Sequence, residues 1–249
     1  MNLISERDII QFRTQGYFVT DVVFEAEPLN AMANEMDRVF EAGVAETKQT
    51  GDQNAIQAAR GKRSYSQFHT RSAVAAEFVK SPIYIEACRN LIGPDVDLYY
   101  NQAAVKPPAL GKVFNWHQDS GYTETEPLEY ITCWTAISDS DLENGCIWVI
   151  PGSHKWGVLE HLPQEEDRTN YSGVTARLAE EDGAIPVEMN AGQVAVFSSL
   201  MLHKSGPNTT KDRTRYGFVP QYHVPGVILK QSGKPTGDRY PVIRDGKAV

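Results

Sequence analysis

The sequence lacks the features that mark several classes of protein. It has 3 cysteines among 249 residues (Cys88, Cys133 and Cys146) and no Cys-x-x-Cys pair, so neither a disulfide framework nor a cysteine zinc site is expected. The longest apolar runs, such as 146–150, are far shorter than the roughly 20 residues that cross a bilayer. Residues 1–8 show no basic region followed by an apolar stretch. We therefore expect reduced, buried thiols in a cytoplasmic protein without a membrane partner.

An excess of positive charge is also missing. Lys and Arg number 24 against 32 Asp and Glu, a formal net charge of −8. Nucleic acids and anionic membranes are bound chiefly through clustered Lys and Arg, so neither is expected as a partner. The apolar content of 41% is that of a globular chain rather than a disordered one. The expected partner is a small-molecule substrate, and a homodimer is compatible with this composition.

The first part of the chain, about 1–94, has the pattern of helices. Ser5 followed by Asp8 is a capping-box pattern, and Gly16 is expected to end that helix. Apolar residues repeat at three- and four-residue spacing from Pro28 to about Ala45. Ser81-Pro82 and Gly93-Pro94 are start and stop signals for a further helix.

From about 95 to 225 the pattern changes to short β-rich runs separated by turn residues. These runs are 96–105, 130–138, 145–150, 185–189, 193–198 and 214–224. Many short strands without regular intervening helices favour an antiparallel sandwich or barrel. The polar stretch 157–184 has no strong periodicity and is interpreted as a lid-like insertion. The sequence thus predicts a mainly β jelly roll with N-terminal helices packed on it, as one domain over 1–249.

Two histidines and one aspartate are the candidate metal ligands. In His117-Gln118-Asp119 the two outer side chains lie on one face if the chain is extended. His203 follows the apolar run 194–197, at or just past a strand end. Two imidazoles and a carboxylate form the facial triad of non-haem iron(II) oxygenases, but they also suit a zinc hydrolase. Gly121 is expected to leave room for a ligand.

Arg213 and Arg215 stand ten and twelve residues beyond His203, at the start of a β-rich run. At this spacing both side chains would lie on the same face of a strand. A planar guanidinium suits bidentate binding of a carboxylate. Either arginine is therefore a candidate for anchoring an acidic co-substrate.

Four ordered blocks of sequence resemble the phytanoyl-CoA dioxygenase family. These blocks are Trp116-His117-Gln118-Asp119, 141–146 (DLENGC), 149–154 (VIPGSH) and 203–208 (HKSGPN) followed by an arginine. The resemblance covers about 100–225 well and reaches more faintly to the N-terminus. It implies a double-stranded β-helix, the cupin-like jelly roll, and an oxygenase that uses Fe(II), 2-oxoglutarate and O₂.

The resemblance also implies roles for individual residues. His117, Asp119 and His203 match the iron ligands, and the carboxylate at 119 favours hydroxylation, with release of succinate and CO₂, over halogenation. The arginine that holds 2-oxoglutarate usually lies eleven residues after the second histidine, where this chain has Thr214. Counting back from Tyr222 favours Arg215 over Arg213. The remaining residues that match the co-substrate pocket are Ser205, Trp134 and Gln102.

The other histidines are given structural interpretations. His154 is assigned to a turn, His69 to a solvated polar loop, and His161 and His223 have no evident partner. The segments 62–69, 121–126 and 157–184 are the candidates for the substrate wall and lid. Because the chain shows no dense Lys/Arg cluster for the phosphates of coenzyme A, a free metabolite is the expected substrate. A zinc hydrolase and a non-catalytic jelly-roll binding module remain the alternatives.

Overall fold

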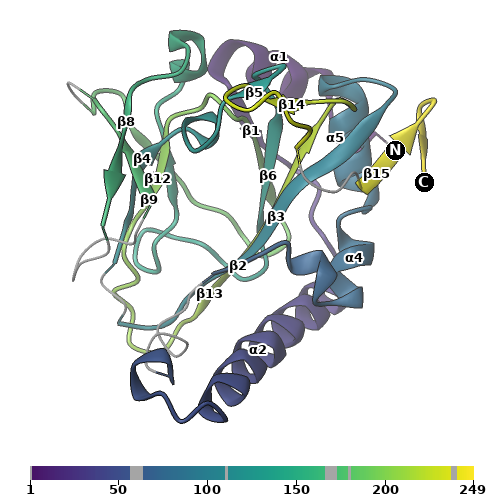
Figure 1. The fold of residues 1–249 in the computed structure, drawn as a ribbon. Coiled ribbons are helices and arrows are strands. Elements are labelled where there is room, and N and C mark those ends of the chain that lie inside the picture. The colour runs from purple at the N-terminus through teal and green to yellow at the C-terminus, as the bar shows by residue number, and fades with distance from the viewer. Residues whose placement is uncertain (1, 57–63, 110–111, 166–172, 179–180, 237–239) are drawn as a thin grey trace.

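Two antiparallel sheets that face each other form the body of the protein (Figure 1). The structure is a computed structural model that describes residues 2–56, 64–109, 112–165, 173–178, 181–236 and 240–249. The larger sheet has the order β1-β11-β6-β13-β3-β15-β16, with β2 paired to β3. Its strands are β1 (Tyr17–Val19), β2 (Ser64–Ser66), β3 (Val96–Lys106), β6 (Ile131–Ala136), β11 (Val194–Ser198), β13 (Arg215–His223), β15 (Tyr240–Arg244) and β16 (Lys247–Ala248).

The smaller sheet has the order β10-β7-β12-β4. Its strands are β4 (Phe114–His117), β7 (Ile147–Val149), β10 (Ile185–Val187) and β12 (His203–Ser205). Strand β6 is buried at every position, which is typical of a strand covered on both faces. Two curled antiparallel sheets that enclose a common interior are the jelly roll that the sequence predicts.

The N-terminal helix begins and ends at the residues predicted from the sequence. Helix α1 (Glu6–Gln15) has a capping box at Ser5 and Asp8, and Gly16 ends it in the left-handed conformation with φ of 86°. A Cβ atom at Gly16 would also lie 2.4 Å from Nδ1 of His154. Both the backbone angle and this contact therefore require glycine.

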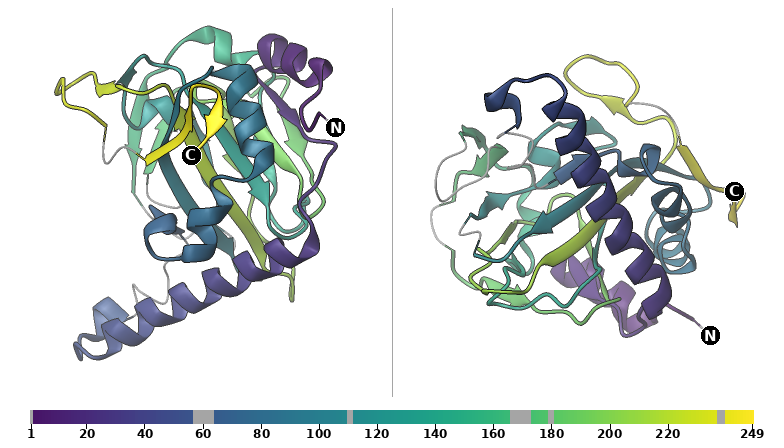
Figure 2. Two further views of the ribbon diagram at one scale, coloured as in Figure 1. Left: turned by 90° about the vertical axis from the view of Figure 1, so that its right-hand side faces the viewer. Right: turned by 90° about the horizontal axis from the view of Figure 1, so that it is seen from below.

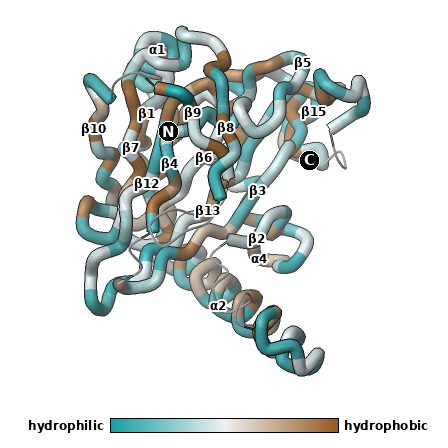
Figure 3. Tube along the Cα trace, turned by 60° about the vertical axis from the view of Figure 1, so that its left-hand side comes forward, coloured by the Kyte–Doolittle hydropathy of each residue, from teal (hydrophilic) through white to brown (hydrophobic). Residues whose placement is uncertain are grey.

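Three further helices pack against the outer face of the larger sheet: α2 (Ala26–Lys48), α4 (Ala73–Phe78) and α5 (Pro82–Leu91). Figure 2 shows α2 crossing this side of the molecule and projecting beyond it. Its apolar residues Met32 and Met36 are fully buried, whereas its far end is hydrophilic (Figure 3). The Tyr222 hydroxyl donates a hydrogen bond to the Val79 carbonyl at 2.6 Å and so ties β13 to the helical layer.

The stretch 157–184 is not a plain loop, contrary to the sequence interpretation. It contains an antiparallel hairpin of β8 (His161–Gln164) and β9 (Gly173–Ala176), and β9 packs beside β4. A short pair, β5 (Thr125–Glu126) with β14 (Ile228–Leu229), and the 3-10 turns η1 (Phe68–Thr70), η2 (Asp119–Gly121) and η3 (Ser153–Trp156) complete the described elements. The hairpin has no apolar periodicity because neither strand buries one complete face in the core.

The expectation of buried, reduced thiols is confirmed. All three cysteines are buried and free. Within the described residues, no helix is both long enough and apolar enough to cross a bilayer. Each of these predicted strands is found, with ends shifted by at most two residues; the run 185–189, for example, corresponds to β10, which ends at Val187.

Candidate metal centre

The fold brings His117, Asp119 and His203 together. His117 is the last residue of β4, Asp119 begins η2, and His203 is the first residue of β12. Strands β4 and β12 pair antiparallel with His203 directly opposite His117. Directly opposite residues project to the same side of a sheet, and here the two imidazole rings lie 4.1 Å apart.

The donor atoms of the three residues converge. Oδ1 of Asp119 lies 3.7 Å from Nε2 of His203 and 4.0 Å from Nε2 of His117. All three donor atoms lie within 4.8 Å of one another. Two imidazole nitrogens and one carboxylate oxygen in this arrangement fit the facial triad that binds Fe(II).

Backbone contacts orient both imidazoles for a metal. Nδ1 of His117 donates to the Asn115 carbonyl at 2.7 Å, and Nδ1 of His203 donates to the Met201 carbonyl at 3.0 Å. Each contact leaves the lone pair of Nε2 available on the cavity side. Burial lowers the pKa of His117 well below its usual value, and the nearby His203 lowers it further. The neutral imidazole, the form that binds metals, is therefore favoured.

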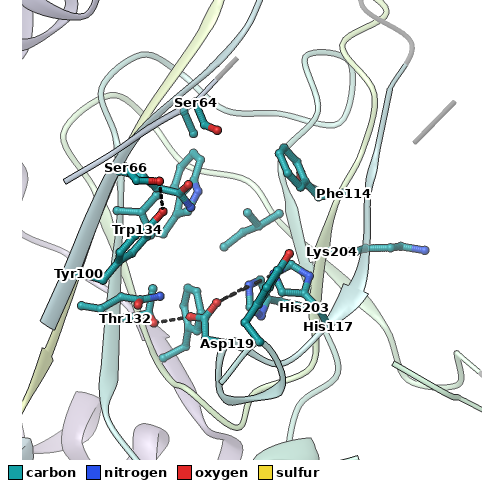
Figure 4. A pocket seen from close by; sticks show the side chains of 18 of the residues that line it. Ser64, Ser66, Tyr100, Phe114, His117, Asp119, Thr132, Trp134, His203 and Lys204 are labelled. Carbon is teal, nitrogen blue, oxygen red and sulfur yellow. Dashed lines mark hydrogen bonds and ion pairs between the residues drawn. The ribbon is translucent and has the colours of Figure 1, made fainter. Parts of the chain in front are cut away.

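The carboxylate is held in the same way. The Thr132 hydroxyl on β6 donates to Oδ2 of Asp119 at 2.5 Å, which leaves Oδ1 directed to the histidines (Figure 4). The larger sheet thus fixes a ligand that belongs to the loop after the smaller sheet. Thr132 could not be identified from the sequence, because its role depends on the packing of one sheet over the other.

The triad lies on the wall of a cavity of about 470 Å³ between the two sheets (Figure 4). Its lining is mixed, with aromatic, hydroxyl and amide side chains from both sheets. The lining residues of the larger sheet and its edge include Ser64, Ser66, Tyr99, Tyr100, Gln102, Ala104, Tyr130, Thr132, Trp134, Phe197, Arg215, Val219 and Gln221. Those of the smaller sheet and the loop that follows it are Phe114, His117, Asp119, Tyr122, Thr123, Ile147, His203, Lys204 and Ser205.

Arg215, Trp134, Gln102 and Ser205, the residues that the resemblance assigns to the co-substrate, all line this cavity. The Arg215 guanidinium is buried, lies 5.1 Å from the centre of the Trp134 ring, and donates to the Gly145 carbonyl at 2.6 Å. Gly217 makes room for this stack, since a Cβ there would lie 2.7 Å from the Trp134 ring. One end of the cavity therefore carries a fixed positive charge.

Lys106 is a second buried basic residue at this end, and it was not predicted from the sequence. It lies directly opposite Arg215 in the β3–β13 pair, and its Nζ donates to Oγ of Ser205 at 2.9 Å. Burial lowers the pKa of Lys106 well below its usual value, and the charge of Arg215 lowers it further. A lysine at the end of a β-rich run carries no sign that it will be buried.

Arg213 does not share the face of Arg215, contrary to the expectation. It precedes β13, and its guanidinium pairs with Asp141 and with Oε2 of Glu143, the latter at 2.8 Å. The chain is extended only from residue 215 onward, so the two-residue periodicity does not apply to Arg213. Arg213 is thus directed to the surface, away from the cavity lining.

His161 has a partner next to the triad, although the sequence suggested none. Its Nε2 accepts a hydrogen bond from the backbone amide of Gln118 at 3.0 Å. Its ring fills the space beside Gly121, where a Cβ would lie 2.2 Å from Cε1. Gly121 therefore accommodates a histidine rather than a ligand.

The interpretations of the other histidines are revised in part. His223 is buried against Tyr99 and contacts Thr236 Oγ1 through Nε2 at 3.2 Å, so it has partners after all. His69 is half-buried rather than fully solvated: its Nδ1 lies 2.6 Å from Nδ2 of Asn101, and burial lowers its pKa. His154 lies against helix α1, with Nε2 3.4 Å from the Arg13 carbonyl, as a structural role predicts.

The candidate substrate wall is found in part. Ser64 and Ser66 from the segment 62–69, and Tyr122 and Thr123 from 121–126, line the cavity. Residues 57–63, 166–172 and 179–180 lie outside the described residues. No described residue of 157–184 lines the cavity. The described part of that segment contacts the site through His161, which accepts a hydrogen bond from the Gln118 amide.

A jelly roll with this donor set defines the class of iron(II)- and 2-oxoglutarate-dependent oxygenases. The sequence profile of the family described as "Phytanoyl-CoA dioxygenase (PhyH)" matches residues 12–216. The chain belongs to this family.

Two individual relatives share between about a quarter and a third of their residues with this chain over the matched regions. A phytanoyl-CoA dioxygenase of Arabidopsis thaliana is 31% identical over 114 residues, which are 45% of this chain and 40% of the relative. The chain thus matches less than half the length of that relative. An ectoine dioxygenase of Bordetella parapertussis is 24% identical over 225 residues, covering 82% of this chain and 71% of the relative.

Among solved structures, EvdO2 from Micromonospora carbonacea var. aurantiaca in complex with 2-oxoglutarate has the same fold. It superposes with a TM-score of 0.70 at 21% identity and covers 94% of this chain and 96% of its own. At this identity the likeness concerns the fold.

Proposed function

We propose that the protein is an iron(II)- and 2-oxoglutarate-dependent oxygenase that hydroxylates a small-molecule metabolite and releases succinate and CO₂. The observation that carries the proposal is the convergence of His117, Asp119 and His203 on a cavity whose lining also includes buried Arg215. Membership of the phytanoyl-CoA dioxygenase family supports the same cofactors.

The three residues suit iron because together they would hold it through one carboxylate and two imidazoles and would leave room for 2-oxoglutarate and O₂. Bound there, iron with 2-oxoglutarate and O₂ would supply the oxidising power that amino-acid side chains lack. The chain's own part is to hold the ligands. Asn115 and Met201 carbonyls orient the histidines, and Thr132 orients the carboxylate.

The cationic end of the cavity suits the distal carboxylate of 2-oxoglutarate. A buried guanidinium binds a carboxylate through two parallel hydrogen bonds, and Arg215 is held in place by Trp134 and Gly145. Like charges directly opposite in a sheet are destabilising, and Lys106 faces Arg215 across β3 and β13. A bound dianion would offset this repulsion, and the Ser205 hydroxyl beside Lys106 is a further donor for it.

The substrate is expected to be a free metabolite rather than a coenzyme A thioester. The two relatives carry names that point to different substrates, phytanoyl-CoA and ectoine, so family membership alone does not choose. A cavity of about 470 Å³ is within the range of small-molecule sites, roughly 300–1,000 Å³. Phosphate groups are bound mainly by Arg and Lys clusters, and the chain is acidic with a net charge of −8.

Anaerobic titration tests the cofactors. Addition of 2-oxoglutarate to the Fe(II)-loaded protein should produce a weak visible charge-transfer band, and His117→Ala should abolish it. His154→Ala, a histidine on the α1 side of the molecule, should leave the band unchanged. A zinc hydrolase or a binding module would give no band, and either result would overturn the proposal. Substrate-triggered succinate formation then tests the reaction.

A further inference from the structure

Four tyrosines gather on the cavity wall around the metal ligand Asp119. Tyr99 and Tyr100 come from β3, Tyr130 precedes β6, and Tyr122 follows η2. The charge of Asp119 contributes to a raised pKa in all four phenols, after burial as the main cause, and the pKa of Tyr122 rises to about 12. We call these four residues the tyrosine wall.

An irregularity of strand pairing builds this wall. Tyr99 and Tyr100 are consecutive, and consecutive side chains of a regular strand point to opposite faces. Along β13, however, Gln221 pairs with Tyr100 and the next residue, Tyr222, pairs with Leu98. Tyr99 is thus the extra residue of a β-bulge, and both rings line the cavity. Bulges that redirect a side chain are common beside active sites.

Ring contacts hold the wall in place. The Tyr99 ring lies 4.9 Å from Tyr130 and 5.1 Å from His223, at tilted or edge-on angles. The Tyr122 ring stands edge-on to His117 at 5.4 Å. The Tyr100 hydroxyl lies 2.6 Å from the Ser66 hydroxyl (Figure 4). The wall therefore presents fixed aromatic surfaces next to the metal ligands.

Several neutral polar groups accompany the wall. Gln102, Gln221, Ser66 and Thr123 supply amides and hydroxyls to the same lining. Two basic residues stand among the described lining residues besides the histidines. Arg215 stacks on Trp134, and Lys204 points away from the cavity to Glu181 at 2.6 Å (Figure 4).

We propose that the tyrosine wall binds an uncharged ring compound that carries hydroxyl groups, and that this compound is the substrate of the site. The inference rests on the proposed function. Aromatic side chains stack on the faces of rings, and phenol, hydroxyl and amide groups pair with substrate hydroxyls. A carboxylate or phosphate at this wall would be desolvated without a basic partner from it, at a high cost.

Saturation-transfer NMR on the complex with Co(II) and 2-oxoglutarate tests the inference with a matched pair of probes. Phenyl β-D-glucoside and phenyl β-D-glucuronide share the same rings and differ by one carboxylate. We expect saturation of the glucoside and at least about tenfold weaker binding of the glucuronide, because its charge is buried without a partner. Phenyltrimethylammonium and octanoyl-CoA serve as cationic and phosphate-bearing probes and should bind less well than the glucoside.

Variants connect the signal to the wall. Tyr100→Phe removes one hydroxyl and should weaken glucoside binding roughly three- to tenfold, the effect of one hydrogen bond. Tyr99→Leu removes a ring and should abolish most of the saturation. Tyr216→Phe is the matched control, because its hydroxyl bonds to Asp37 outside the cavity.

Three results would overturn the inference: no saturation of the glucoside, binding of a charged probe equal to or tighter than that of the glucoside, or equal binding by wild type and Tyr99→Leu. The visible band of the Fe(II) and 2-oxoglutarate complex separates this failure from that of the proposed function. A band without glucoside binding contradicts only the substrate class. Absence of the band contradicts the oxygenase itself.

Discussion

Nε2 of His161 accepts a hydrogen bond from the backbone amide of Gln118, the residue between the candidate metal ligands His117 and Asp119, at 3.0 Å. Nδ1 of His161 donates to the Leu159 carbonyl at 2.8 Å, so the ring is bonded on both sides as a neutral tautomer. The Gln118 side chain donates to the carbonyls of Gly157 and Leu200. The backbone between two ligands is thus fixed by the segment that leads into β8.

We predict that His161→Ala weakens metal binding by roughly 10- to 100-fold, the usual effect of losing a group that orients metal ligands. The Gln118 amide loses its acceptor, and the loop that carries Asp119 is less well ordered. Calorimetric titration with Mn(II) measures this change without turnover. His154→Ala is the matched control, and equal Mn(II) affinity in the two variants would contradict the positioning role.

The close contact of Gly121 with His161 gives a second prediction. A Cβ at position 121 would lie 2.2 Å from the imidazole, so Gly121→Ala should lower the free energy of unfolding by about 1–3 kcal/mol through overpacking. Urea denaturation measures this loss. In the double variant Gly121→Ala/His161→Ala the clash is absent. Its loss of unfolding free energy should therefore be smaller than the sum of the losses in the two single variants.

Gly206→Ala is the control for this experiment, because a Cβ there would meet nothing closer than 3.6 Å. We expect it to change stability by less than Gly121→Ala does. Strict additivity of the Gly121 and His161 variants would show that the two residues do not interact.

The parts of the fold that could be predicted from sequence are those set by local chemistry. Ser5 and Asp8 cap a helix through groups three residues apart, and Pro82 is favourable in a first helical turn. The His-x-Asp spacing predicts convergence because it depends only on an extended backbone. By contrast, the β8–β9 hairpin is held by contacts with β4, which no local pattern encodes.

The same limit applies to the site. The family pattern pointed to Ser205 and favoured Arg215 over Arg213, because the distances of these residues from His203 along the chain carry no physical signal of their own. Lys106, His161 and Thr132 were missed because their roles depend on which strands face each other. The bulge at Tyr99 is a property of two paired strands and is not visible in either strand alone.

Thr132→Val gives a third prediction. The substitution keeps the shape of the side chain but removes the donor to Oδ2 of Asp119, a buried hydrogen bond to a charged group. Such bonds contribute about 1.5–3 kcal/mol, so we expect roughly 10- to 100-fold weaker Fe(II) binding. The apparent Kd for Fe(II), from activity at fixed 2-oxoglutarate, measures the effect.

Thr132→Ser retains the hydroxyl and should recover most of the Fe(II) affinity. If serine and valine variants were equally impaired, the loss would reflect packing of β6 rather than orientation of the carboxylate.

The two neighbouring arginines give the last prediction. Arg215→Gln removes a buried guanidinium from the cavity, whereas Arg213→Gln removes one that pairs with Asp141 and Glu143 near the surface. Truncating one partner of a buried charge pair costs about 2–5 kcal/mol, so the KM for 2-oxoglutarate should rise at least about 30-fold in Arg215→Gln. Arg215→Lys keeps the charge but not the bidentate geometry, so its KM for 2-oxoglutarate should lie between those of the wild type and Arg215→Gln. Arg213→Gln should leave this KM within about twofold, because its guanidinium pairs with acidic side chains and does not line the cavity. The reverse pattern, measured by succinate formation over a range of 2-oxoglutarate concentrations, would assign the anchor to Arg213.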